Sequence, residues 1–484
     1  MAGATTGRLT RLGCLIFSCL SAAVLAGCAV GPDYRPPQVP VPDAWQSQPS
    51  SGLKTEATDS PTLATWWTVL NDPVLNQLIE RAVAENKSVK GAMAAVTAAR
   101  ARRSASAAPF WPSLDASAGG SRSHSESTGT AKNHDAGLDA AWELDLFGGQ
   151  RRSLESATAT LAATEADLRD VLVTLLGDVA LSYLDVRTTQ SRLDYAERNL
   201  ESQREVVDMT DWRHQAGLAS VLEVEQAKAS YAQTSAGLPS LEAALAAAKN
   251  RLAVLTGQAP GALNQLLAER KPIPTAPLEI VASVPADLMR RRPDIRAAER
   301  RLAAQSAQIG VATAQLYPSL SLSGSLGLVA GTAGDLFSSG ATASNRYGLS
   351  LSMPIFHGGA LRQNIKVQNA LFDQALSTYE STVLTAYEDV ENSLTQWVNE
   401  QRRHAALVQA ADSARTAREL ALMQYNSGLV DFQTVLNADR DQISADDQLA
   451  VSDGEMTANL VRLYKAMGGG WSVFPPAVTA SAGQ

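Results

Sequence analysis

The feature that most constrains this chain is a turn-and-helix segment that it contains twice. The segment HQAGLASVLEV begins at His214, and 211 positions later the chain reads YNSGLVDFQTV. The shared offset places Gly217 on Gly428 and Leu218 on Leu429. Self-similarity at a fixed offset indicates a structure built from related units. The sequence therefore predicts a tandem duplication with a similar turn in each half.

A long stretch without proline leads into each turn. From Gly149 to about Ala216 the chain is rich in Ala, Leu, Glu, Arg and Thr, which predicts one helix of roughly 65 residues, or about 100 Å at 1.5 Å per residue. A second such stretch follows Pro354 and reaches Gly428. Because most helical stability in proteins comes from packing, helices of this length need partners along their whole span.

Shorter helices are expected before and after these long ones. Asp72 followed by Pro73 is a strong start signal, for a helix that should run to about Ala108. Ser220 and Glu223 have the spacing of a capping box after the first turn. The remaining short helices are expected to end at Gly257 with a kink at Pro239, to run from about Pro293 to near Tyr317, and to run from Asp431 to Gly468.

Two pairs of strands are expected between the helices, at about 112–147 and 318–356. The clearest alternation places Leu138, Ala140, Trp142, Leu144 and Leu146 on one face and acidic or small residues on the other. In the second pair, leucines alternate with serines and glycines. One apolar face and one polar face suit a sheet between lipid and water, and the alternative is a soluble β-sandwich with buried leucines.

Four such strands are too few to close a membrane barrel, since the smallest barrels have about eight strands. Unpaired strand edges cannot face lipid, so several copies would have to share one barrel, and three copies would supply twelve strands. Aromatic residues stand where the strands meet the helices, as in an interfacial girdle: Trp111, Phe147, Tyr317 and Phe356.

The N-terminus has the pattern of an export signal over residues 1–27. Arg8 and Arg11 precede a short apolar stretch that ends in Leu-Ala-Gly-Cys at Cys28. This ending is a lipobox, at which bacteria acylate the cysteine and cleave before it, and the alternative is a plain signal cleaved nearby. The two other cysteines also lie within the signal, so the rest of the chain has no disulfide and no thiol nucleophile.

The remaining composition excludes several functions. The net charge is −8, with no basic stripe of the kind that nucleic-acid binding requires. The five histidines are scattered without a pair at metal-ligand spacing, and no phosphate-binding loop or catalytic constellation is recognisable. We therefore expect neither an enzyme nor a resident cofactor or metal.

Several segments also resemble the TolC-like outer membrane efflux proteins, in the lipoprotein branch of OprM and NodT. They are GCAVGPDYRPP, WWTVLNDPVLNQLIERAVAEN, LDLFGGQRR, RRRPDIRAAERRLAAQSAQIGVATAQLYPSLSLSGSLG and MPIFHGGALRQNI. The resemblance implies a mixed α/β membrane protein, a homotrimer whose four strands per chain form a transmembrane β-barrel continuous with a periplasmic helical barrel. It also implies the outer membrane as destination. Ala29 agrees with this destination, because in the lipoproteins that the chain resembles an aspartate at this position would favour retention in the inner membrane.

The resemblance implies a passive exit duct of a tripartite efflux system for drugs or other small toxic compounds. Its partners would be a periplasmic adaptor (membrane fusion) protein and an inner-membrane pump of the RND type, with outer membrane lipid around the barrel. Two alternatives stay open: an exit duct for secreted polypeptides, and a periplasmic coiled-coil scaffold held only by its lipid.

The resemblance also implies two groups of site residues. Gly217, Leu218, Gly428 and Leu429 would form the hairpin tips that contact the adaptor, and the alternative is a mere helix stop. The periplasmic aperture would be constricted by Tyr425, Asn437 and Arg440, where the family has an acid in place of Asn437. We therefore expect Arg440 to pair with another acid, such as Asp439 or Asp441, or to form a weaker hydrogen bond with a neutral partner.

The expected organisation follows from these elements. After the signal, an extended proline-rich arm covers 28–72, a first repeat covers 73–257 and a connector covers 258–292. A second repeat covers 293–468, and residues 469–484 form a tail.

Overall fold

The computed structural model of the chain describes residues 29–40, 42, 45–46, 53–54, 63–127, 129–275, 280–281 and 291–471. The expected signal 1–27 and the lipobox Cys28 lie outside the described residues. The chain divides into two compact units. Unit 1 comprises Met1–Gln38, Ala95–Glu165 and Ala297–Ser381, and unit 2 comprises Val39–Ala94, Ala166–Arg296 and Thr382–Gln484.

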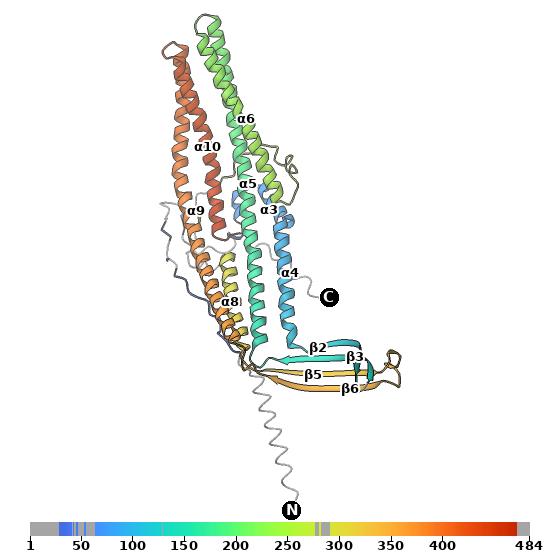
Figure 1. Cartoon of the computed structure of the whole chain (residues 1–484). Helices are drawn as coiled ribbons and strands as arrows, with labels where there is room; N and C mark the ends of the chain where they lie inside the picture. The colour runs from blue at the N-terminus through green and yellow to red at the C-terminus, as the bar shows by residue number, and fades with distance from the viewer. Residues whose placement is uncertain are drawn as a thin grey trace, which may run out of the picture. The chain divides into compact units, whose positions relative to one another are not determined.

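The duplication is confirmed by two pairs of helices with equal lengths. The helices α5 (Gly149–Gln215) and α9 (Ala360–Asn426) each have 67 residues, and α6 (Val221–Leu255) and α10 (Phe432–Ala466) each have 35. Every boundary repeats at the 211-residue offset. Figure 1 shows that α5 turns back into α6 and that α9 turns back into α10.

The predicted capping signals are confirmed at three helix starts. Asp72 accepts hydrogen bonds from the N–H groups of Val74 and Leu75 at the start of α3. The capping box of Ser220 and Glu223 is present in both directions at the start of α6. Asp431 caps α10 by accepting from Thr434 N–H. In each case a side-chain oxygen satisfies an N–H group that has no partner within the helix.

The prediction of one continuous helix from Asp72 to Ala108 is wrong. The structure has α3 (Pro73–Glu85) and α4 (Lys87–Ala107), separated at Asn86. Asn86 has an extended ψ of 133°, and its Oδ1 accepts hydrogen bonds from Ser88 N–H and Val89 N–H. Its Nδ2 donates to Leu255 O at the end of α6, 2.9 Å away. The side chain therefore caps a new helix and ties it to a neighbour, which helix propensity alone does not reveal.

The helix α8 (Pro293–Ala314) begins at Pro293, as predicted. The helix α6 continues through Pro239 without interruption of its assigned range. Among the described residues, no helix combines the length and the apolar character needed to cross a membrane. Short 3-10 helices occupy Trp66–Leu70, Ala108–Phe110 and Ala333–Asp335.

The core of unit 2 gathers around side chains of α3 and α5. Leu75, Ile79, Leu176 and Tyr183 are fully buried or nearly so. Arg187 is also fully buried, and its guanidinium donates to Tyr183 Oη at 3.0 Å and to the carbonyl of Glu269 at 2.8 Å. These acceptors compensate a charge that would otherwise be costly to bury.

Unit 1 contains one antiparallel sheet made from both repeats. Its strands are β2 (Ser113–Ser125), β3 (Gly129–Leu144), β5 (Ser319–Ala330) and β6 (Thr342–Ser352), in the order β2-β3-β5-β6 (Figure 1). The first repeat therefore joins the second where β3 pairs with β5. A separate two-residue parallel pair links β1 (Leu53–Lys54) to β4 (Ile280–Val281).

The register of the sheet separates apolar from polar side chains. Leu144 pairs with Leu320 and Leu320 with Leu351, while on the opposite face Glu143 pairs with Ser321. The apolar face is uncovered in the single chain, since Leu326, Leu349 and Leu351 are each at least 64% exposed. The alternative of a β-sandwich with buried leucines is therefore wrong for this chain.

Candidate functional site: the hairpin tips

Both tips are made by the same backbone device. Gly217 has φ 73° and Gly428 has φ 72°, the left-handed region that L side chains rarely adopt. Leu218 N–H donates to Arg213 O at 2.8 Å, and Leu429 N–H donates to Gln424 O at 2.9 Å. These are the six-residue bonds of a Schellman motif. No atom lies within 4 Å of a Cβ built at either glycine, so the backbone conformation alone requires glycine here.

The leucine at each tip is not required by the turn. Leu218 is 68% exposed and Leu429 is 75% exposed. In many Schellman motifs the corresponding residue packs back onto the helix, but these two leucines point their apolar surface outwards. Val221 and Leu222 are exposed beside the first turn as well. The tips therefore present apolar surface that the chain itself does not cover.

The two tips are joined by Tyr425, three residues before the second turn. Its ring is buried and contacts Phe432 at 5.3 Å between ring centroids. Its hydroxyl donates to Glu223 Oε2 at 2.5 Å, and the Arg213 guanidinium lies 4.7 Å above the ring. We call these four residues, Arg213, Glu223, Tyr425 and Phe432, the tip clamp. The clamp connects α5 and α6 of the first hairpin to α9 and α10 of the second.

The clamp has an electrostatic signature. Burial and the hydrogen bond to Glu223 raise the pKa of Tyr425 to about 12. The same hydrogen bond lowers the pKa of Glu223, and bonds from Ser220 and the charge of Arg213 lower it further. The neutral phenol and the ionised carboxylate thus stabilise each other. The family resemblance singled out Tyr425, whereas the sequence placed Glu223 in the capping box near the tip. Their contact was missed, because nothing in the repeat pattern predicts a contact between the hairpins.

The other two predicted aperture residues are exposed in the single chain. Asn437 Oδ1 accepts a hydrogen bond from Gln433 Nε2 at 3.0 Å. Arg440 makes no hydrogen bond or ion pair with any residue that the structure describes. It lines a cavity of about 620 Å³ between α5, α6 and α10.

The predicted pairing of Arg440 with Asp439 is wrong within this chain. Asp439 is buried and accepts from Arg418 Nε at 3.0 Å and from Gln203 Nε2 at 2.6 Å. Residues 439 and 440 are adjacent in a helix and so point to different faces. Among the described residues, Asp441 likewise makes no hydrogen bond or ion pair with Arg440.

The chain was compared with known proteins. It matches the family described as outer membrane efflux protein over residues 78–258 and 284–469. Nodulation protein T of Rhizobium leguminosarum bv. viciae is 34% identical over 458 residues, which cover 94% of this chain and 94% of that protein. The solvent efflux pump outer membrane protein SrpC of Pseudomonas putida is 32% identical over 459 residues, 93% of this chain and 97% of that protein.

A solved structure is also similar over its whole length. The outer-membrane channel OprN superposes with a TM-score of 0.85 and shares 37% sequence identity. The superposition covers 92% of this chain and 100% of that chain.

Proposed function

Because the chain belongs to the outer membrane efflux protein family and is an outer membrane channel for efflux, we propose that it is the passive exit duct of a tripartite pump. In this proposal an inner-membrane pump, of the RND type, supplies the energy, and a periplasmic adaptor connects pump and duct. In this proposal no residue has a catalytic role. Support comes from relatives that are named as outer membrane components of efflux pumps.

We propose a homotrimer as the assembled form. A chain with four strands and an uncovered apolar face cannot close a barrel alone, whereas three copies supply twelve strands. The repeats at 73–257 and 293–468, the arm at 28–72, the connector at 258–292 and the tail at 469–484 complete the proposed organisation. Three chains with two tips each would give six tips.

We propose that Gly217-Leu218 and Gly428-Leu429 contact the adaptor. The observation that carries this proposal is the pair of exposed leucines placed by two equivalent Schellman motifs. A helix stop would need the glycines but would not need the leucines. Exposed apolar side chains on a rigid turn are suited to fill pockets in a partner.

The test replaces both leucines with a charged residue. Leu218→Asp combined with Leu429→Asp should leave the protein in the outer membrane but abolish drug resistance in a strain that depends on this duct, because a desolvated carboxylate opposes docking. Leu218→Met with Leu429→Met keeps volume and apolarity and should retain resistance. Normal resistance in the double aspartate variant would exclude the leucines as contacts.

We propose Tyr425, Asn437 and Arg440 as the periplasmic aperture. The support is local: Tyr425 holds the two hairpins together, while Asn437 and Arg440 lie exposed at i and i+3 on α10. In a trimer these positions would form rings of three. Without an acid at position 437, the resting aperture would depend mainly on the tip clamp.

We propose small molecules rather than polypeptides as cargo. SrpC is named for solvent efflux, and another relative, OpmQ of Pseudomonas aeruginosa, is named for pyoverdine export at 34% identity over 472 residues. Measuring accumulation of a fluorescent drug in cells with and without the protein tests this cargo class directly.

A further inference from the structure

The apolar face of the sheet carries two basic residues near the turn between β2 and β3 (Figure 1). In the register of these strands Arg122 pairs with Lys132, and Ala116 pairs with Leu138. Partners in an antiparallel register share a face, and every second residue of a strand returns to that face. Arg122 and Lys132 therefore lie on the same face as Leu138, and both are exposed.

The charges of β2 and β3 are divided between the two faces of the sheet. The acids of these strands all lie on the opposite, polar face: Asp115, Asp135, Asp139 and Glu143. Among the described residues, Arg122 and Lys132 make no hydrogen bond or ion pair, and Glu126 in the turn pairs with neither. The chain thus places two cations on a face from which its own carboxylates are absent within these strands.

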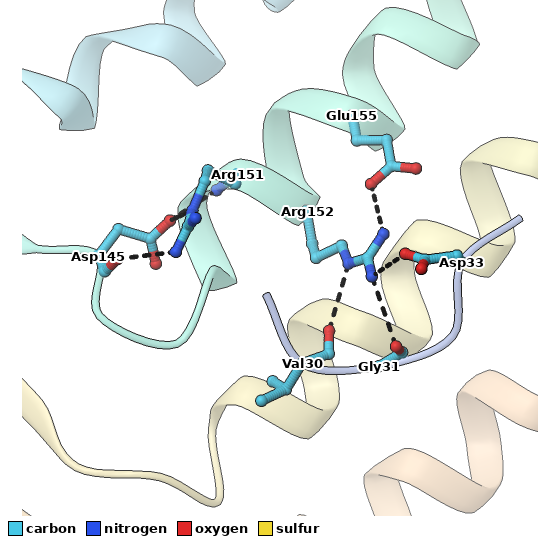
Figure 2. Close-up of polar contacts among 7 residues, drawn as sticks. All are labelled: Val30, Gly31, Asp33, Asp145, Arg151, Arg152 and Glu155. Carbon is cyan, nitrogen blue, oxygen red and sulfur yellow. Dashed lines mark hydrogen bonds and ion pairs between the residues drawn. The ribbon is translucent and has the colours of Figure 1, made fainter. Parts of the chain in front are cut away.

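At the end of the sheet where β3 leads into α5, the chain compensates a cation itself. Figure 2 shows the guanidinium of Arg152 donating to the carbonyl oxygens of Val30 and Gly31 and to the carboxylates of Asp33 and Glu155. This side chain is only 6% exposed, and three of its four acceptors belong to the docked segment 29–33. The basic pair of the apolar face has no such acceptors in the described chain, so an anion that pairs with it comes from outside.

The pairing of Arg122 with Lys132 is itself unfavourable. Like charges at directly opposite positions of an antiparallel pair repel each other, since the ladder holds their Cβ atoms about 5 Å apart. An anion between the two side chains changes this repulsion into two attractions. A phosphate group fits both cations, because it accepts a bidentate bond from a guanidinium and a point charge from an ammonium.

The position of the pair along the strand indicates where the anion comes from. Between Ala136 and Leu144 the apolar face of β3 carries only Ala, Leu and Trp. A tilted strand crosses the hydrocarbon core of a bilayer with about 9–11 residues, which is the length of this stretch. His134 and Lys132 follow on the same face towards the turn. In a membrane Lys132 therefore lies at the level of the lipid headgroups.

An apolar hollow lies on the same face, towards β5 and β6. It has a volume of about 520 Å³, and its lining includes Leu138, Leu326, Leu328 and Phe337. Among the described residues no charged side chain lines it, and its polar lining residues are Ser344 and Asn345. The three leucines lie on the apolar face by register, and Phe337 is 83% exposed. The hollow is therefore open to an acyl chain of a surrounding lipid.

We propose that Arg122, Lys132 and this hollow, together the lipid patch, bind a phosphate-bearing lipid of the outer leaflet. The phosphate lies between the two cations, and an acyl chain lies in the hollow. The proposal rests on the proposed barrel, which turns the apolar face towards lipid. Apolar contact alone does not select one lipid, because all lipid tails are similarly apolar. The two cations supply the preference for an anionic headgroup.

The test compares two forms of one lipid. The purified full-length protein in detergent is titrated with lipid A, and with the same lipid A after removal of its phosphates, and bound lipid is measured by native mass spectrometry. We expect the phosphorylated form to bind with a Kd about thirtyfold lower, since each cation contributes about fivefold towards an anionic lipid. Equal Kd values for the two forms would overturn the proposal.

Substitutions of the cations test the headgroup contact. Arg122→Gln combined with Lys132→Gln should raise the Kd for lipid A about thirtyfold, whereas Arg122→Lys with Lys132→Arg keeps both charges and should retain tight binding. Arg346→Gln is the matched control, because Arg346 pairs with Ser325 on the polar face of the same sheet. A Kd that the double glutamine variant leaves unchanged, or that Arg346→Gln raises equally, contradicts the site.

A second pair of variants tests the hollow. Phe337→Ala removes one wall and should weaken binding of lipid A severalfold, because apolar contact area is lost. Leu351→Ala removes a similarly exposed side chain of the apolar face that does not line the hollow, and it should leave the Kd unchanged. Equal Kd values in these two variants would overturn the assignment of the hollow.

Failure of the lipid patch is distinguishable from failure of the proposed duct. Wild-type protein that forms no trimer resistant to SDS overturns the barrel and the lipid patch together. Trimers that bind lipid A and its dephosphorylated form equally overturn the lipid patch alone.

Discussion

At the scale of single residues, the two tips share the glycine and leucine but differ in every side chain of the tip clamp. Tyr425 occupies the position of His214, and Phe432 occupies that of Val221. The second hairpin therefore supplies the ring, and the first supplies its partners Arg213 and Glu223. The duplication preserved the turn, while the contacts between the hairpins depend on their differences.

We predict that Cys28→Ser abolishes incorporation of radioactive palmitate while much of the protein remains assembled. The acyl chains strengthen membrane attachment, but the proposed barrel also holds the protein in the membrane. Labelling is measured after immunoprecipitation, with Cys14→Ser as the matched control that should label normally. Persistent labelling of Cys28→Ser would refute the assignment.

We predict that Tyr425→Phe raises the open probability of the channel about tenfold, because it removes a charge-assisted hydrogen bond worth roughly 1.5–3 kcal/mol and keeps the ring. Arg440→Ser, which removes a guanidinium without a partner among the described residues of the chain, should increase single-channel conductance at the proposed aperture. Both are measured in planar bilayers. Wild-type behaviour in both variants would place the aperture elsewhere.

Acid should open the same clamp. Glu223 has a lowered pKa in the folded chain, so its contribution is complete above the ordinary value of 4.5 and is lost as the pH falls through the lowered pKa. Open probability should therefore rise below about pH 4.5, and Glu223→Gln should be open already at neutral pH and lose this dependence. An unchanged acid response in Glu223→Gln would show that another group controls it.

At the scale of elements, the sequence predicted features set by local chemistry and missed those set by contacts. The ends of α5, α6, α9 and α10 follow from capping residues and glycine, which act within a few positions. The break at Asn86 was missed, since its Nδ2 partner Leu255 is distant in the sequence. The docking of residues 29–33 on Arg152 was missed for the same reason. Both depend on buried polar groups that find partners only in the folded chain.

We predict that Asn86→Ala destabilises the junction of α3 and α4 by about 1–3 kcal/mol, because it removes a helix cap and leaves the carbonyl of Leu255 without its donor. Hydrogen exchange of the Ser88 and Val89 amides should accelerate. Asn369→Ala is the control, because Asn369 is exposed within α9 and its loss should change stability by less than about 0.5 kcal/mol. Equal exchange rates in Asn86→Ala and wild type would contradict the capping role.

At the scale of the whole molecule, the described residues leave apolar surfaces uncovered, among them the leucine face of the sheet and the leucines of the tips. The proposed trimer in the outer membrane covers the first with lipid, and the proposed adaptor covers the second. A lipid-anchored periplasmic scaffold would leave the sheet face in water, where a contiguous apolar patch favours aggregation.

The most direct test of this account is to reconstitute the purified full-length protein in a planar bilayer and record its conductance. We predict trimers that resist dissociation by SDS and discrete single-channel openings, which are more frequent in Tyr425→Phe. Protein that migrates as a monomer in SDS and produces no conductance would contradict the channel and favour the scaffold.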